Sequence, residues 1–216
     1  MLCGFEIFGS FLHAVFISNF FYLNQSPLYR LAIFASGAGS NAEKIIDYFR
    51  GSQKISIALL VSNNHEAGVL LIAKKNNIPI LIIEKEKFFR GDAFLPELKK
   101  HQINFIILAG FLWKIPVKII HAFPNAIINI HPALLPKYGG KGMYGRYVHE
   151  SVIAHHETQS GITIHYVDEI YDHGKIIFQE KCIVKKNETP ESLAAKIHQL
   201  EHAHFAPQIE KLLLYN

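Results

Sequence analysis

From residue 29 onward, short apolar runs alternate with segments of helical periodicity. The apolar runs have the length and composition of strands buried on both faces, at residues 30–35, 55–61, 79–83, 105–108 and 126–130. Apolar residues at helical spacing occupy the segments between them, at residues 42–50, 66–76, 95–101 and 116–123, the last beginning at Pro116. This alternation predicts an α/β fold with an open, mostly parallel twisted sheet and helices on both faces.

The pattern changes after residue 136. Residues 137–145 form a loop with four glycines, and a short helix is expected at 149–155. Two strands follow at 161–167 and 175–184, and the turn between them is too short for a crossover helix. An antiparallel hairpin is therefore expected in the C-terminal half. A final helix is predicted after Thr189, which can act as its N-cap residue.

Composition narrows the possible classes of protein. The 216 residues are 50% hydrophobic and 19% charged, which is typical of a globular chain with a sizeable core. The net charge of +4 is small and not clustered, so no nucleic-acid partner is expected. Cys3 and Cys182 have no metal-binding or redox spacing, which favours a reducing compartment and a cytoplasmic location.

Residues 1–29 differ from the rest because they are rich in Phe and nearly free of charge. Glu6 stands where a signal peptide would have Lys or Arg, and polar residues interrupt the apolar run. Three interpretations remain: a wrongly assigned start, a packed or peripheral arm, or a weak membrane anchor. We favour the first two, and no stable membrane association is expected.

The stretch AIINIHPALLP, residues 126–136, carries the first candidate chemistry. Asn129 and His131 are two residues apart, so in a strand they project to the same face. They would lie at the carboxyl end of a buried strand, where open α/β sheets place their ligands. An amide can donate to a developing oxyanion, and an imidazole can move a proton near neutral pH. The alternative is a capped strand end with a satisfied histidine.

Residues 37–42, GAGSNA, join the first strand to the first helix. N–H groups at a helix start favour an anion, so this loop predicts a phosphate site. A dinucleotide site would also need an acidic residue at the end of the second strand, but Ser62, Asn63 and Asn64 stand there. A single phosphate monoester fits better, and the alternative is a tight turn without a ligand.

Two further segments are weaker signals on their own. In residues 108–114, Gly110 would let a planar ligand approach the backbone, although plain core packing is the better explanation of this segment on its own. In the turn 168–174 a carboxylate could orient an imidazole, but Asp is common in turns for local hydrogen bonds. His198, His202 and His204 lie near Glu201, yet no known metal motif accompanies them, so no metal is expected.

Taken together, these segments resemble the phosphoribosylglycinamide formyltransferase family, the folate-dependent enzymes of purine synthesis. The matching pieces are FASGAGSNAEKII, LVSNN, ILAGFLWKIP, IINIHPALLPKYGG, SGITIHYVDEIYDHGKIIFQ and IHQLEHAHF. The resemblance implies a Rossmann-like formyltransferase fold over residues 30–216. Residues 30–125 would be a phosphate-binding half and residues 126–216 a catalytic and folate-binding half, with the first 29 residues outside it.

The resemblance also implies the reaction and its residues. The formyl group of 10-formyltetrahydrofolate, a co-substrate, would pass to the amine of N1-(5-phospho-D-ribosyl)glycinamide in IMP biosynthesis. The implied catalytic residues are Asn129, His131 and Asp172. The implied phosphate- and ribose-binding residues are Gly39, Ser40, Asn41 and Glu201. The implied folate-binding residues are Leu112, Trp113, Ile115, Asp168 and Asp172. Both partners are small molecules, no metal is needed, and the chain would be a monomer or a homodimer.

Some residues depart from the family pattern and keep alternatives open. Trp113 is bulkier than is usual after the AGF tripeptide, and the loop GGKGMYGRYVH differs from the better known versions that contain His. The acceptor could instead be another amine, such as a nucleotide-sugar, or methionyl-tRNA or water. A tRNA enzyme would be expected to carry a further C-terminal domain, and a hydrolase a regulatory N-terminal one. A nucleotide sensor without turnover is the non-enzymatic alternative.

Overall fold

The computed structural model describes residues 29–215. One seven-stranded sheet runs through them in the order β3-β2-β1-β4-β5-β6-β7. The first five strands in this order are parallel, whereas β6 pairs antiparallel with both β5 and β7. This confirms the predicted fold class, a mostly parallel open sheet with an antiparallel part in the C-terminal half. The interpretations of residues 1–28 lie outside the described residues.

The strands and helices agree with most of the expected segments. The strands are β1 (Tyr29–Phe34), β2 (Ile55–Ser62), β3 (Ile80–Ile82), β4 (Phe105–Leu108), β5 (Ile127–His131), β6 (Gln159–Tyr166) and β7 (Ile176–Ile183). The helices are α2 (Ser40–Tyr48), α3 (Val69–Lys75), α4 (Lys85–Phe89), α5 (Leu95–Lys100), α6 (Val117–Ala122), α7 (Arg146–Ala154) and α8 (Pro190–Leu214).

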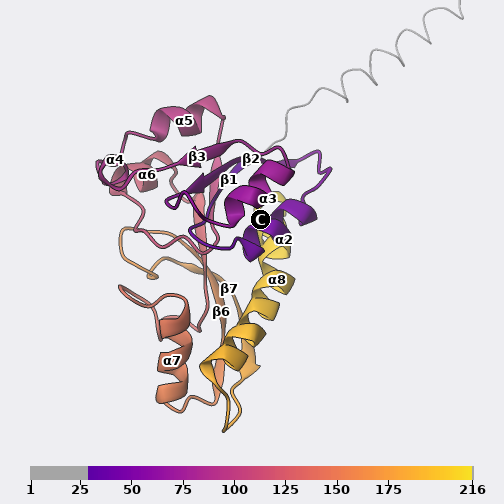
Figure 1. Cartoon of the computed structure of the whole chain (residues 1–216), viewed down its shortest axis with the longest axis vertical. Helices are drawn as coiled ribbons and strands as arrows, with labels where there is room; N and C mark the ends of the chain where they lie inside the picture. Colours follow the sequence, from indigo (N-terminus) through magenta and orange to yellow (C-terminus); the bar gives the residue numbers. More distant parts are fainter. Residues whose placement is uncertain (1–28, 216) are drawn as a thin grey trace, which may run out of the picture.

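The central strands read as unbroken apolar runs because helices cover both faces of the sheet. In β1, Leu31 and Ile33 face a core built with α2, α3 and α8, while Ala32 and Phe34 face a second core with α4, α5 and α6. Figure 1 shows these two groups of helices on opposite sides of the strands. The parallel part of the sheet is therefore rigidly held, with its strand ends free to carry side chains.

The antiparallel part extends away from the parallel one, flanked by α7 and α8 (Figure 1). Helix α8 begins as expected with Thr189, whose hydroxyl accepts the Ser192 N–H, while the Ser192 hydroxyl accepts the Thr189 N–H. This reciprocal capping box satisfies two backbone donors that the helix itself leaves unpaired. Leu193 and Ile197 then bury one face of α8 completely, which fixes the next turn and Glu201 relative to the sheet.

Several boundaries differ from the sequence expectation, and one helix was not expected. Tyr29 belongs to β1, and it pairs with Ile55. Pro116 is the N-cap of α6 in an extended conformation, and the helix begins at Val117, one residue later than expected. Helix α7 begins at Arg146, three residues before His149. Helix α4 was not expected, because its five residues are too few to show a helical period.

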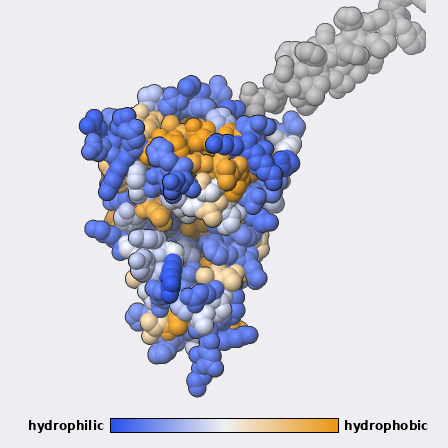
Figure 2. Space-filling model, viewed as in Figure 1, coloured by the Kyte–Doolittle hydropathy of each residue, from blue (hydrophilic) through white to orange (hydrophobic). Residues whose placement is uncertain are grey.

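On the face seen in Figure 2, hydrophobic residues gather over the upper part, and the lower part is mostly hydrophilic. Within the described part of the chain, no helix is both long and apolar enough to cross a bilayer.

Candidate active site

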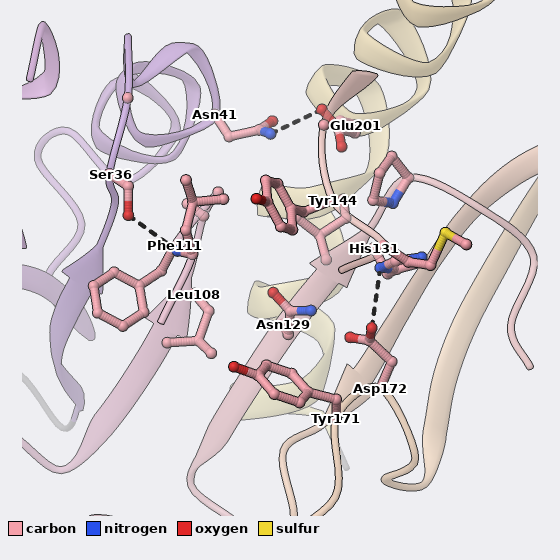
Figure 3. Close-up of a pocket in the computed structure, with 18 of the residues that line it drawn as sticks. Ser36, Asn41, Leu108, Phe111, Asn129, His131, Tyr144, Tyr171, Asp172 and Glu201 are labelled. Carbon is pink, nitrogen blue, oxygen red and sulfur yellow. Dashed lines mark hydrogen bonds and ion pairs between the residues drawn. The ribbon is translucent and has the colours of Figure 1, made fainter. Parts of the chain in front are cut away.

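From β1 the chain continues to β2 on one side of the sheet, and from β4 it continues to β5 on the other side. The loops that follow β1 and β4 therefore diverge, which opens a crevice between these two strands. In open α/β sheets ligands bind at this point, beyond the carboxyl ends of the strands. A cavity of about 890 Å³ lies there, and every residue predicted for the site lines it. Figure 3 shows side chains from the two halves of the molecule facing one another across this cavity.

The loop after β1 presents free backbone donors to the cavity. Gly39 is the N-cap of α2 and makes no side-chain capping bond; its φ of 86° is left-handed. The first helical hydrogen bond runs from Glu43 N–H to Gly39 O, so the N–H groups of residues 39–42 have no helical partner. A Cβ on Gly39 would lie 2.5 Å from Val69 Cγ2. Glycine is thus required here by both conformation and space, and the exposed donors suit an anion.

Across the cavity from this loop, Glu201 of α8 reaches back to α2. Its Oε2 accepts from Asn41 Nδ2 at 2.9 Å and from His198 Nδ1 at 2.9 Å (Figure 3). The Glu201 residue is only 5% exposed, and the Oδ1 atom of Asn41 is buried with no hydrogen-bond partner. The bond to Glu201 raises the pKa of His198. This pair of helices therefore brings an oriented carboxylate to the cavity, where it can accept from a hydroxylated ligand.

The segment after β4 forms the apolar wall of the cavity. Ser36 Oγ accepts the Leu112 N–H at 3.0 Å, which ties this segment to the end of β1. Leu112 is 48% exposed at the mouth, and Ile115 is buried. The Trp113 ring packs against Phe88 and Phe89 of α4, with ring centroids 5.8 and 5.7 Å away. The bulky Trp113 is thus accommodated by α4, which the sequence pattern did not predict.

His131 ends β5 with each ring nitrogen facing an oxygen atom. Nε2 lies 2.7 Å from the Tyr138 carbonyl oxygen, which can only accept, so Nε2 carries a proton. Nδ1 lies 3.6 Å from Asp172 Oδ2 (Figure 3). Burial lowers the pKa of His131, and the Asp172 charge opposes this only in part. At neutral pH the ring is therefore neutral, with its lone pair on Nδ1 beside a carboxylate, and it can accept a proton there.

Asn129 is oriented by a histidine that the sequence did not single out. Its partner across the antiparallel pair is His165, and Asn129 Nδ2 lies 3.1 Å from His165 Nε2. His165 Nδ1 donates to the Tyr166 carbonyl at 2.8 Å, so Nε2 is the acceptor of the pair. One N–H of the amide is thus fixed by His165, and the second N–H remains available beside His131.

Asp172 is held in place by the two loops that meet at the cavity. Its Oδ2 accepts the Gly140 N–H at 2.8 Å, and its Oδ1 lies 3.6 Å from His165 Nε2. Burial would raise the pKa of Asp172, but the positive charge that His165 and His131 can carry and the Gly140 N–H outweigh it and keep that pKa below its usual value. The carboxylate therefore stays ionised and can stabilise a positive charge on His131.

The turn that carries Asp172 depends on two other residues. Asp168 accepts the Ile170 N–H at 2.8 Å and contacts His173, so it stabilises the turn locally as well as lining the cavity. Gly174 closes the turn where a Cβ would lie 1.9 Å from the Tyr166 carbonyl oxygen. Only glycine permits this close approach of the two hairpin strands.

The sequence missed three features of the site. His165 needed the exact register of the β5–β6 pair, which no local pattern supplies. The Tyr138 carbonyl, which sets the protonated nitrogen of His131, is a backbone group invisible to residue type. His149 is 4% exposed and lines the cavity, but it was expected only as the start of a helix. Among residues 29–215, no three His, Cys, Asp or Glu side chains are grouped so as to hold a metal ion.

Comparisons with known proteins agree with this geometry. The model of the formyl transferase family matches residues 29–209. A phosphoribosylglycinamide formyltransferase of Bacillus subtilis is 35% identical over 192 residues, covering 87% of this chain and 96% of that protein. A chloroplastic enzyme of the same name from Arabidopsis thaliana is 44% identical over 179 residues, covering 80% of this chain and 61% of that protein. The chain thus spans about 60% of the length of such plant relatives.

Solved structures give the same result. The phosphoribosylglycinamide formyltransferase of Bacillus halodurans superposes with a TM-score of 0.78 at 35% identity, covering 86% of this chain and 96% of that one. That of Anaplasma phagocytophilum gives 0.77 at 32% identity, covering 85% of each chain. The resemblance seen in the sequence is therefore confirmed by both kinds of comparison. The chain belongs to the formyl transferase family, and the relatives described here are named phosphoribosylglycinamide formyltransferases.

Proposed function

We propose that this protein transfers the formyl group of 10-formyltetrahydrofolate to the amine of N1-(5-phospho-D-ribosyl)glycinamide, giving the formylated ribonucleotide and tetrahydrofolate. The observation that supports this most is one continuous cavity that joins the donors of residues 39–41 to Asn129, His131 and Asp172. A phosphorylated amine could bind the first group with its phosphate and reach the second with its amine. The relatives' names support the same reaction.

The chemistry follows from the protonation states at the site. The neutral amine attacks the formyl carbon, a C–N bond forms, and the carbonyl electron pair moves to oxygen. Asn129 donates its free N–H to that oxyanion. His131 accepts the amine proton on Nδ1, directly or through water, and Asp172 stabilises the resulting imidazolium. The protonated His131 also supports the oxyanion. As the carbonyl re-forms and the bond from the formyl carbon to folate N10 breaks, His131 returns this proton, directly or through water, to N10.

The acceptor would be held at its phosphate and ribose. Gly39, Ser40 and Asn41 offer backbone N–H groups to the phosphate, where the α2 dipole adds to the attraction. Glu201, which is buried and already oriented by Asn41 and His198, accepts hydrogen bonds from the ribose hydroxyls. Holding both substrates in one cavity supplies orientation, which can account for a large part of such a rate enhancement.

The folate donor would occupy the apolar side of the cavity. Leu112, Trp113 and Ile115 line it there, and Asp168 and Asp172 border it from the turn. A planar ring can lie against this wall, and the backbone and carboxylates of the turn can bind its polar edge. Formyl transfer between the two substrates needs no further cofactor, so we propose a site that works without a metal.

The direct test supplies the purified full chain with both substrates and follows the formation of tetrahydrofolate. Turnover that depends on glycinamide ribonucleotide supports the proposal. A phosphorylated sugar amine and water are compared in the same assay, because a nucleotide-sugar is the alternative acceptor. Transfer only to the sugar amine would reassign the substrate, and no transfer to any acceptor would remove the enzymatic function.

Several properties stay predictions. We propose a division into a phosphate-binding half, 30–125, and a catalytic half, 126–216, on one continuous sheet. We also propose a cytoplasmic location, although the plant relatives are named as chloroplastic, and a monomer or homodimer in solution. Microscopy of a fluorescent fusion and analytical ultracentrifugation test the last two.

A further inference from the structure

His149 is a buried histidine on the cavity wall that the proposed mechanism does not use. It is the fourth residue of α7, it is 4% exposed, and it lines the cavity. Its Nδ1 atom is buried without any hydrogen-bond partner. A buried polar atom left unpaired costs free energy, and most such atoms in proteins find a partner. The unpaired Nδ1 therefore constrains which ring nitrogen of His149 can carry the proton.

The surroundings decide which nitrogen can meet that ligand. Burial lowers the pKa of His149, and the nearby His198 and His131 rings lower it further, so the ring is neutral at neutral pH. A neutral imidazole carries one N–H and one lone pair. An unpaired lone pair is tolerated better than an unpaired N–H, so the lone pair belongs on the enclosed Nδ1. Nε2 therefore carries the proton, and it is the nitrogen that a bound molecule can reach.

His149 also lines the same cavity as both ends of the site. His131 at the catalytic end and His198 and Glu201 on α8 line that cavity with it. The acceptor of the proposed reaction would span the same two ends. In phosphoribosylglycinamide, the group between the ribose and the terminal amine is an amide, whose carbonyl oxygen needs a donor when it leaves water.

We propose that His149 is a positioning residue whose Nε2–H donates to the amide carbonyl oxygen of the acceptor, so that the amine is directed at the formyl carbon. This inference rests on the proposed function. It adds a third anchor to the phosphate and ribose contacts, and the anchor nearest the reacting amine limits its rotation. Such a contact acts on the binding of one substrate and leaves the proton transfer at His131 unchanged.

The test compares three substitutions at this position. Gln can place an amide N–H near the position of Nε2, whereas Asn and Ala cannot. We expect His149→Ala and His149→Asn to raise the acceptor KM about tenfold, the usual weight of one neutral hydrogen bond, with the donor KM and the pH profile of kcat unchanged. His149→Gln should stay within about threefold of the wild type by the same reasoning. His155→Ala, on the exposed end of the same helix, is the matched control.

A second acceptor makes the result specific. In the thioamide analogue, sulfur replaces the amide oxygen and accepts hydrogen bonds weakly. The wild type should discriminate against it, and His149→Ala should lose most of that discrimination. Equal acceptor KM in wild type and all three variants would overturn the inference, as would unchanged discrimination in a folded His149→Asn protein. Failure of the wild type to formylate the normal acceptor would instead remove the proposed function.

Discussion

Replacing Asp172 with Asn tests the electrostatic part of the mechanism. The amide is nearly the same size and its oxygen can still accept the Gly140 N–H, so the turn should keep its shape. What disappears is the negative charge 3.6 Å from His131 Nδ1, in a pair whose side chains are 11% and 4% exposed. At an effective dielectric constant of about 20, Coulomb's law gives about 4.6 kcal/mol for this distance. If the imidazolium forms in the rate-limiting step, kcat should fall about 10³-fold.

The assay is steady-state formation of tetrahydrofolate over a range of pH. The Asp172 charge raises the pKa of His131 against the effect of burial. Its removal should therefore move the acidic limb of the kcat profile to lower pH. The acceptor KM should change little, because the phosphate and ribose contacts are untouched. A variant that keeps kcat within tenfold of the wild type, with the same pH profile, would refute a charge-stabilised His131.

Three further substitutions test the parts that hold the site. Gly39→Ala should destabilise the fold by roughly 1–3 kcal/mol, because Gly39 has a left-handed φ and an added Cβ would collide with Val69. Thermal unfolding measures this loss. Gly37→Ala is the control and should be near neutral, because a Cβ at Gly37 meets nothing within 4 Å. Thr189→Ala removes one half of the capping box of α8, and should cost about 1 kcal/mol in urea unfolding; an unchanged midpoint would count against the box. Glu201→Gln removes the partner that raises the pKa of His198. The stability from that pair is present below the unfolded pKa of about 6.5 and is lost as pH rises through the folded value, so the stability gap between wild type and variant should be larger at about pH 5.5 than at about pH 8.5; a constant gap would contradict it.

The sheet was predictable because its strands carry strong, local signals. Residues 31–35 and 105–108 are unbroken apolar runs, and the structure buries both. Thr189 and Pro190 likewise predicted the start of α8, as its N-cap and its first residue. The misplaced boundary at Pro116 shows the limit, since proline is compatible with both the N-cap and the first helical turn, and only the ψ of 142° decides between them.

The site was predictable only as far as residue type and strand ends determine it. Asn129, His131 and Asp172 could be named from their motifs, and the structure brings them together. Their hydrogen-bond partners could not be predicted, because the Tyr138 carbonyl, the Gly140 N–H and the His165 ring reach them only through tertiary contacts. The Tyr138 carbonyl determines that Nε2 of His131 carries the proton. It therefore also determines that Nδ1 is the nitrogen that can accept a proton from the amine.

The central claim is that the phosphate loop and the catalytic residues bind opposite ends of one phosphorylated amine. A crystal structure of the full chain with glycinamide ribonucleotide and an unreactive folate analogue tests it most directly. The account predicts the phosphate against the backbone N–H groups of residues 39–41 and the amine beside Asn129 and His131. A phosphate bound elsewhere, or an amine directed away from His131 Nδ1, would contradict it.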